Sequence, residues 1–191
     1  MIAILVILGA GGIVVLVGWL HRRKRKRRRE VLRQTPLSME AREVLLEAVP
    51  LYARLPEAQK PKLEGVTQVF LDEISFEACG GLPAITDEMR LVVASQAALL
   101  LLESGYRDFG RLRTVMIYPD AYTVRDRYGM ESIRLGESWD TGSVVLSWAS
   151  VQAGSRNPED GLNVVLHEFA HQIDQADGEA DGRPVLRRGG D

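Results

Sequence analysis

The chain has 191 residues, which is enough for one domain and an appendage. It is 46% hydrophobic and 26% charged, as in an ordinary globular protein. Its single cysteine, Cys79, excludes a disulfide within the chain and is typical of a reducing compartment. The formal net charge of −2 is an average over two unlike parts, an uncharged and then basic amino terminus and an acidic remainder.

Residues 1–20 contain no charged side chain and are mostly aliphatic. This is about the length that a helix needs to cross a bilayer, and the glycines within it are common in membrane spans. We therefore expect a single transmembrane helix. A signal peptide is not expected, because its positive charges would precede the apolar core and a cleavage site with small residues would follow it.

Eight Lys and Arg residues follow at positions 22–29. The positive-inside rule places such a run in the cytoplasm, which puts the amino terminus outside the cytoplasmic membrane and the rest of the chain inside. The run could also rest on anionic lipid head groups. A nucleic-acid arm is the rival interpretation. Of the 24 basic residues, 16 remain outside the run against 26 acidic ones, a net charge of −10, so we expect no direct nucleic-acid binding. Residues 21–36 are assigned to a basic juxtamembrane linker.

From Leu37 the pattern mixes helices and short strands. Apolar residues at spacings of three and four predict helices over residues 39–55 with a division at Pro50, over 60–74, and over 89–102 after a cap at Thr86 or Asp87. Strands are predicted over residues 113–118, 122–124, 132–135 and 142–148, with a turn-rich joint at 76–83. The strand at 142–148 is either a core strand or an edge strand whose free N–H and C=O groups pair with an extended substrate.

Residues 164–174 carry the chemistry of the chain. His167, Glu168 and His171 form the pattern His-Glu-x-x-His, which is typical of zinc peptidases. Histidines four residues apart lie on one helix face, so both imidazoles can reach one zinc ion. Glu168 is rotated by about 100° from His167 and is placed to act as a general base on a water at the metal. Chance histidines on an amphipathic helix are the alternative, but two of the three histidines in the chain fall at ligand spacing.

We expect this helix to begin with Asn157 as its cap and Pro158 at its first position. Its apolar residues would form a buried stripe beside the histidines: Leu162, Val165, Leu166, Phe169 and Ile173. Residues 177–182 resemble a calcium loop only in part, because Arg188 occupies the twelfth position, where a chelating glutamate belongs. We interpret them as a turn.

Five phrases outside and around the histidine motif are distinctive: residues 75–82, 85–90, 136–139, 144–148 and 160–174. Together they resemble the bacterial Mlc titration factor A family of zinc-dependent peptidases, over about residues 37–186. The resemblance implies an α+β, zincin-like fold of the gluzincin type with aminopeptidase-like activity on peptide substrates. It also implies that His167 and His171 are zinc ligands and that Glu168 is the catalytic base. The best-known member of the family binds and titrates a transcriptional repressor.

The family takes its third zinc ligand from a glutamate on a helix well downstream of the second histidine, and this chain ends at Asp191. A catalytic zinc needs three protein ligands and a water, so residues 37–191 are expected to be a C-terminally incomplete peptidase domain. The candidates for a substitute are all carboxylates: Asp174, Asp177, Glu179 and Asp181. Three hypotheses stay open: a zinc metallopeptidase, a regulatory protein that sequesters a repressor or another partner at the membrane with little or no catalysis, and a fragment without function.

Overall fold

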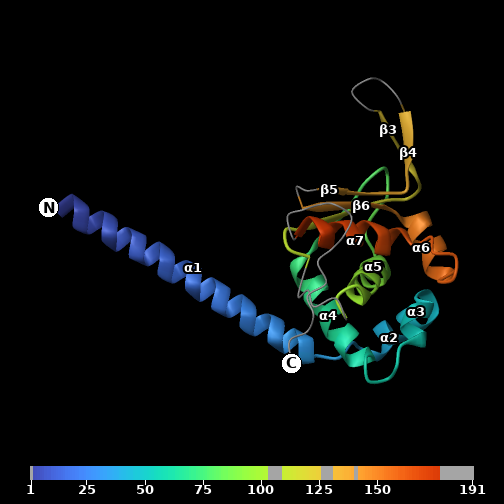
Figure 1. Ribbon diagram of the computed structural model, residues 1–191, viewed down its shortest axis with the longest axis horizontal. Coiled ribbons are helices and arrows are strands. Elements are labelled where there is room, and N and C mark those ends of the chain that lie inside the picture. The colour runs from blue at the N-terminus through green and yellow to red at the C-terminus, as the bar shows by residue number, and fades with distance from the viewer. Residues whose placement is uncertain (1, 103–108, 126–130, 140–141, 177–191) are drawn as a thin grey trace.

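The computed structural model describes residues 2–102, 109–125, 131–139 and 142–176 (Figure 1). Its helices are α1 (Ile2–Gln34), α2 (Met39–Ala48), α3 (Pro50–Arg54), α4 (Lys60–Glu73), α5 (Asp87–Leu99), α6 (Trp148–Arg156) and α7 (Val164–Ala176). Its strands are β1 (Ser75–Ala78), β2 (Thr114–Tyr118), β3 (Tyr122–Arg125), β4 (Glu131–Arg134), β5 (Gly136–Trp139) and β6 (Ser143–Ser147). The mixture of helices and a small sheet confirms the predicted α+β class.

Helices α2 to α5 follow the predicted pattern. Pro50 divides the predicted helix, because proline has no N–H to continue the bonding of α2 and is suited to the first position of α3. Of the two caps considered for α5, Thr86 is the one found, and its hydroxyl accepts a hydrogen bond from the Met89 N–H at 3.1 Å.

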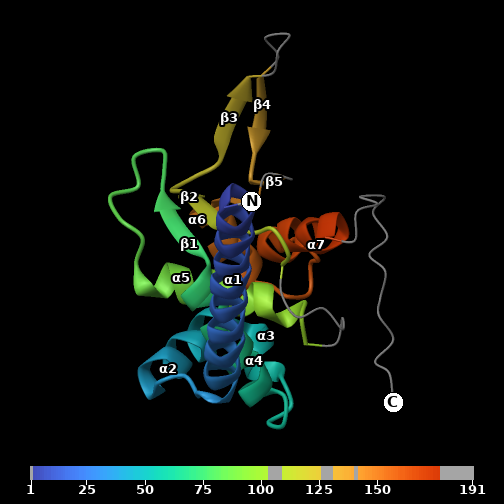
Figure 2. The same cartoon turned by 90° about the vertical axis from the view of Figure 1, so that its left-hand side faces the viewer.

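The main sheet has four strands in the order β1-β2-β6-β5. Strands β1, β2 and β6 are parallel, and β5 runs antiparallel to β6 at the edge. Helices α7 and α5 lie under this sheet, with α4 beyond them (Figure 1). Strands β3 and β4 form a separate antiparallel hairpin that projects from the sheet, as Figure 2 shows most clearly. The edge strand and α7 are therefore neighbours.

The alternative that residues 142–148 form the edge strand is wrong. Strand β6 lies between β2 and β5, and its three successive apolar residues Val144, Val145 and Leu146 are all buried. Consecutive apolar residues are typical of a strand that is covered on both faces. The edge on this side of the sheet is β5, whose Gly-Glu-Ser-Trp sequence has too little apolar alternation to predict a strand.

A cluster of phenylalanines joins α7 to the core. The Phe169 ring lies 5.0 Å from that of Phe109 and 5.6 Å from that of Phe70, in tilted and edge-on arrangements. Such pairs contribute about 0.5–1.5 kcal/mol each beyond the apolar area that they bury. Because Phe169 is fully buried and directly follows Glu168, this cluster fixes the rotation of α7 about its axis.

Helix α1 extends away from the domain, and only its carboxyl-terminal part packs on α4 (Figure 1). Helices α1 and α4 are so close that a Cβ at Gly65 of α4 would lie 2.1 Å from the carbonyl oxygen of Arg33 on α1. Arg25 and Arg29 both bind the Glu73 carboxylate, at 2.8 and 2.5 Å, and Arg28 pairs with Asp72. Burial alone would raise the pKa of Glu73, but the hydrogen bonds from Arg29 and Arg25 outweigh it and lower the pKa to about 2.

The predicted transmembrane helix is not found among the residues whose side chains the structure describes. Among the residues whose side chains are described, no helix is long and apolar enough to cross a membrane. The described side chains of α1 begin at Val15, and the basic run begins at Arg22, so the apolar stretch between them is short. The side chains of residues 1–14, which make up most of the predicted span, lie outside the described part.

Candidate metal centre

Helix α7 begins at Val164, seven residues after the cap that the sequence predicted. Asn157 instead ends α6, and its side chain binds Asp160 at 2.9 Å in a tight turn. Gly161 continues this turn with a φ of 71°, which suits glycine. Leu162 therefore precedes the helix and is exposed, whereas the rest of the predicted stripe lies on α7.

Asn163 is the residue that caps α7. Its Oδ1 accepts a hydrogen bond from the Leu166 N–H at 3.0 Å, and its Nδ2 donates to Gln96 Oε1 at 2.6 Å. Gln96 is fully buried on α5, and its Nε2 donates to Ser155 Oγ of α6 at 2.8 Å. This network ties the start of α7 to two other helices. An asparagine directly before an apolar run is the sequence signal for this helix cap.

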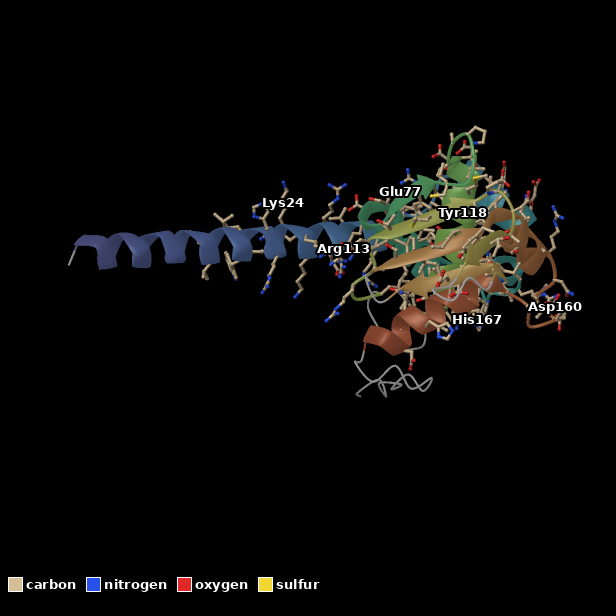
Figure 3. All side chains as sticks on the ribbon, turned by 90° about the horizontal axis from the view of Figure 1, so that it is seen from above. Lys24, Glu77, Arg113, Tyr118, Asp160 and His167 are labelled. Carbon is tan, nitrogen blue, oxygen red and sulfur yellow. The ribbon has the colours of Figure 1, made fainter. Side chains whose placement is uncertain are left out.

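The two histidines of α7 bring their ring nitrogens together. The Nε2 atoms of His167 and His171 are 3.3 Å apart, and the rings are nearly perpendicular at 88°. Both side chains are exposed, and Figure 3 shows His167 pointing outward from α7. Two nitrogen ligands about 2.05 Å from a tetrahedral zinc ion would be about 3.3 Å apart. The spacing of these two side chains therefore fits zinc.

Glu168 faces the sheet instead of the solvent. It is 7% exposed and lies against the backbone of the edge strand β5. A Cβ at Gly136 would lie 2.8 Å from Glu168 Oε1 and 2.7 Å from Val164 Cγ2. One turn further on, Gln172 Nε2 donates to Ser138 Oγ of β5 at 2.7 Å. The edge strand thus runs along α7 on the side of the carboxylate, at a distance that glycine makes possible.

No third protein ligand joins the histidines among the residues that the structure describes, where no group of three His, Cys, Asp or Glu side chains is close enough to hold a metal ion. Asp174 was one candidate, but it is 5% exposed while both histidines are at the surface. The other candidates, Asp177, Glu179 and Asp181, lie outside the described residues, as does the calcium-like turn.

A cavity of about 370 Å³ opens beside Glu168 and His167. Its walls come from the start of β5 and from the turn before α7, and they include Leu135, Gly136, Leu162 and Val164. The cavity places the carboxylate, one imidazole and the edge strand around one space that is large enough for a ligand.

Comparison with known proteins shows which family this arrangement belongs to. A model of the family described as glucose-regulated metallo-peptidase M90 matches residues 21–191, which includes the whole of the basic run. An uncharacterized protein of Synechocystis is 40% identical over 182 residues, which cover 91% of this chain and 64% of that relative. The Mlc titration factors A of Yersinia pestis and Yersinia pseudotuberculosis are 31% identical over 147 residues, 72% of this chain and 53% of theirs.

The chain therefore spans less than two thirds of the length of these relatives. The resemblance seen in the sequence is nevertheless confirmed over nearly all of its residues. The chain belongs to the Mlc titration factor A family of glucose-regulated metallo-peptidases, M90.

Proposed function

We propose that the protein is a zinc metallopeptidase with aminopeptidase-like activity, in which His167 and His171 bind zinc and Glu168 is the general base. The observation that carries this proposal is the 3.3 Å separation of the two Nε2 atoms beside a buried carboxylate and a shared cavity. Membership of a metallo-peptidase family supports it.

Each residue of the site would have a separate role. A bound zinc ion would supply Lewis-acid chemistry, activating a water and polarising the scissile carbonyl. The Glu168 carboxylate accepts the proton of the attacking water and then delivers it to the nitrogen of the leaving amine. Its contact with Gly136 holds the carboxylate in position. The outer edge of β5 offers N–H and C=O groups with which an extended peptide can pair.

Replacing Glu168 with Gln tests the role of the base. We expect peptide hydrolysis by the zinc-loaded chain to fall by a factor of about 10²–10⁴. Zinc content and the melting temperature should stay the same, because the substitution keeps the volume of the side chain and neither histidine is changed. Glu77→Gln, an exposed position on β1, is the matched control. Undiminished hydrolysis by the Glu168→Gln protein would exclude this carboxylate as the base.

A second candidate function is the binding of a regulatory protein. It is supported by the name of the Yersinia relatives, which are titration factors of Mlc. Purified Mlc is the probe for this function. Equal affinity for wild type and for the Glu168→Gln variant would support binding independent of turnover, and the absence of binding by the folded chain would exclude it.

A further inference from the structure

Two large apolar side chains that line the cavity beside Glu168 are exposed. Leu162 is 75% exposed and Leu135 is 53% exposed. Single exposed leucines are common on protein surfaces and need no explanation. These two differ because they come from separate segments of the chain and line one cavity together with the proposed base.

The backbone holds Leu162 firmly although its side chain is exposed. Its N–H donates to Asp160 Oδ1 at 2.9 Å. Its carbonyl oxygen packs against α6, where a Cβ at Gly154 would lie only 2.6 Å away. The side chain is therefore presented to the cavity by a fixed turn.

The backbone of Leu135 is held in a similar way. Its carbonyl oxygen accepts a hydrogen bond from the Ser147 N–H at 2.9 Å, which ties it to the end of β6. Gly136 follows directly and packs against the Val164 side chain, so an apolar wall continues from Leu135 to the turn that carries Leu162.

The polar groups of the cavity are few. Among the described residues that line it, Glu168 and His167 belong to the proposed catalytic site. Asn163 is the remaining polar side chain, and its amide is engaged with Gln96, Gly154 and the Leu166 N–H. The described lining thus offers nothing besides the catalytic groups with which to recognise a charged side chain.

We propose that this cavity is a substrate subsite that takes a bulky aliphatic or aromatic side chain next to the bond that is cleaved. Leu135 and Leu162 would be its specificity-determining residues. The inference rests on the proposed function for the position of the cleaved bond. Its occupant is a substrate side chain because the cavity is continuous with Glu168 and with the edge of β5, along which a peptide would lie.

Equilibrium binding tests the subsite without requiring turnover. The full chain carrying Glu168→Gln, with zinc added, is titrated into X-Ala-Ala-Ala and Ala-X-Ala-Ala peptides that have a free amino terminus and a label at the carboxyl end, and fluorescence anisotropy gives the dissociation constants. We expect Leu or Phe at X to bind at least about tenfold more tightly than Ser or Asp, as apolar pockets discriminate by methylene groups. Leu162→Ser or Leu135→Ser in the same background should reduce this preference to about twofold or less.

Leu46→Ser is the matched control, because Leu46 is a half-exposed leucine on α2 that does not line the cavity. It should keep the full preference, and melting curves establish that every variant is folded. Equal binding of all peptides, no binding of any peptide, or a preference that survives both cavity variants would overturn the inference. Hydrolysis by the wild type is measured separately. Selective binding without hydrolysis would support the subsite and contradict the peptidase activity. Hydrolysis without selective binding would support the peptidase activity and contradict the subsite.

Discussion

Gly136 sets how closely the edge strand approaches the carboxylate of Glu168. Because a Cβ there would lie 2.8 Å from both Cγ and Oε1 of Glu168, even an alanine must displace that side chain. A displacement of about 1 Å at a catalytic group can lower the rate by about 100-fold.

We therefore expect Gly136→Ala to reduce hydrolysis by about 100-fold while zinc content is unchanged, since the three atoms nearest to a Cβ there belong to Val164 and Glu168. Steady-state kinetics and elemental analysis of the same preparation measure the two effects. Gly18→Ala on α1 is the control, because a Cβ there meets no atom within 4 Å. Full activity of the Gly136→Ala protein would show that the position of Glu168 does not matter to catalysis.

Asn163 is the second residue on which the site depends. Replacing Asn163 with Ala removes the cap of α7, which contributes about 1 kcal/mol to the free energy of unfolding. It also removes one hydrogen-bond partner of the buried Gln96, which costs about 1–3 kcal/mol more. We expect Asn163→Ala to lower the free energy of unfolding by about 2–4 kcal/mol in urea titrations. Asn157→Ala, which loses only exposed hydrogen bonds, should cost less than about 1 kcal/mol. Equal losses in the two variants would contradict this role for the network.

The residues that we propose to carry the chemistry can be recognised in the sequence, and the long-range contacts that position them cannot. His167, Glu168 and His171 stand out because ligand spacing on a helix is a local property of the sequence. Gly136 lies 32 residues before Glu168, and Gln96 lies 67 residues before Asn163. Contacts at such separations depend on the fold, which no local pattern contains.

At the scale of elements, the contact between α1 and α4 depends strongly on charge. Glu73 has a pKa of about 2 in the folded protein against an ordinary value of 4.5, and Arg29 and Arg25 hold it ionised. A folded-state pKa that is lowered contributes stability above pH 4.5, and this contribution is lost as the pH falls from 4.5 through 2.

We expect Glu73→Gln to lower the free energy of unfolding by about 1–2 kcal/mol at pH 7, less than the full shift implies because solvent screens the exposed Arg25. The difference between the two proteins should shrink as the pH falls below about 4.5, because wild type then loses the same charge. Urea titrations between pH 7 and pH 3 measure it, with Glu77→Gln as the exposed control. A gap that stays constant over this range would show that the ion pairs do not stabilise the fold.

The strands show which elements local pattern can assign. The apolar run of β6 predicted a strand correctly, but it left open whether that strand was central or at the edge. Strand β5 was missed, because it is a strand only through its pairing with β6 and its contact with α7. Which strand forms the edge beside α7 is therefore a property of the sheet as a whole.

At the scale of the whole molecule, the four-stranded sheet and the helices beneath it bring α7, the edge strand β5 and the cavity beside Glu168 into one place. The predicted class and family hold, whereas the predicted transmembrane helix was inferred from residues whose side chains are mostly outside the described part. The proposed function depends above all on whether the two histidines of α7 hold a zinc ion.

Zinc content per chain, measured by elemental analysis of the full-length protein after dialysis, tests this point most directly. We expect one zinc per chain in wild type and in His21→Ala, which removes the remaining histidine on α1. We expect none in His171→Ala, because losing one of two neighbouring imidazoles opens the site. Zinc retained equally by all three proteins, or absent from folded wild type, would contradict the assignment of His167 and His171 as metal ligands.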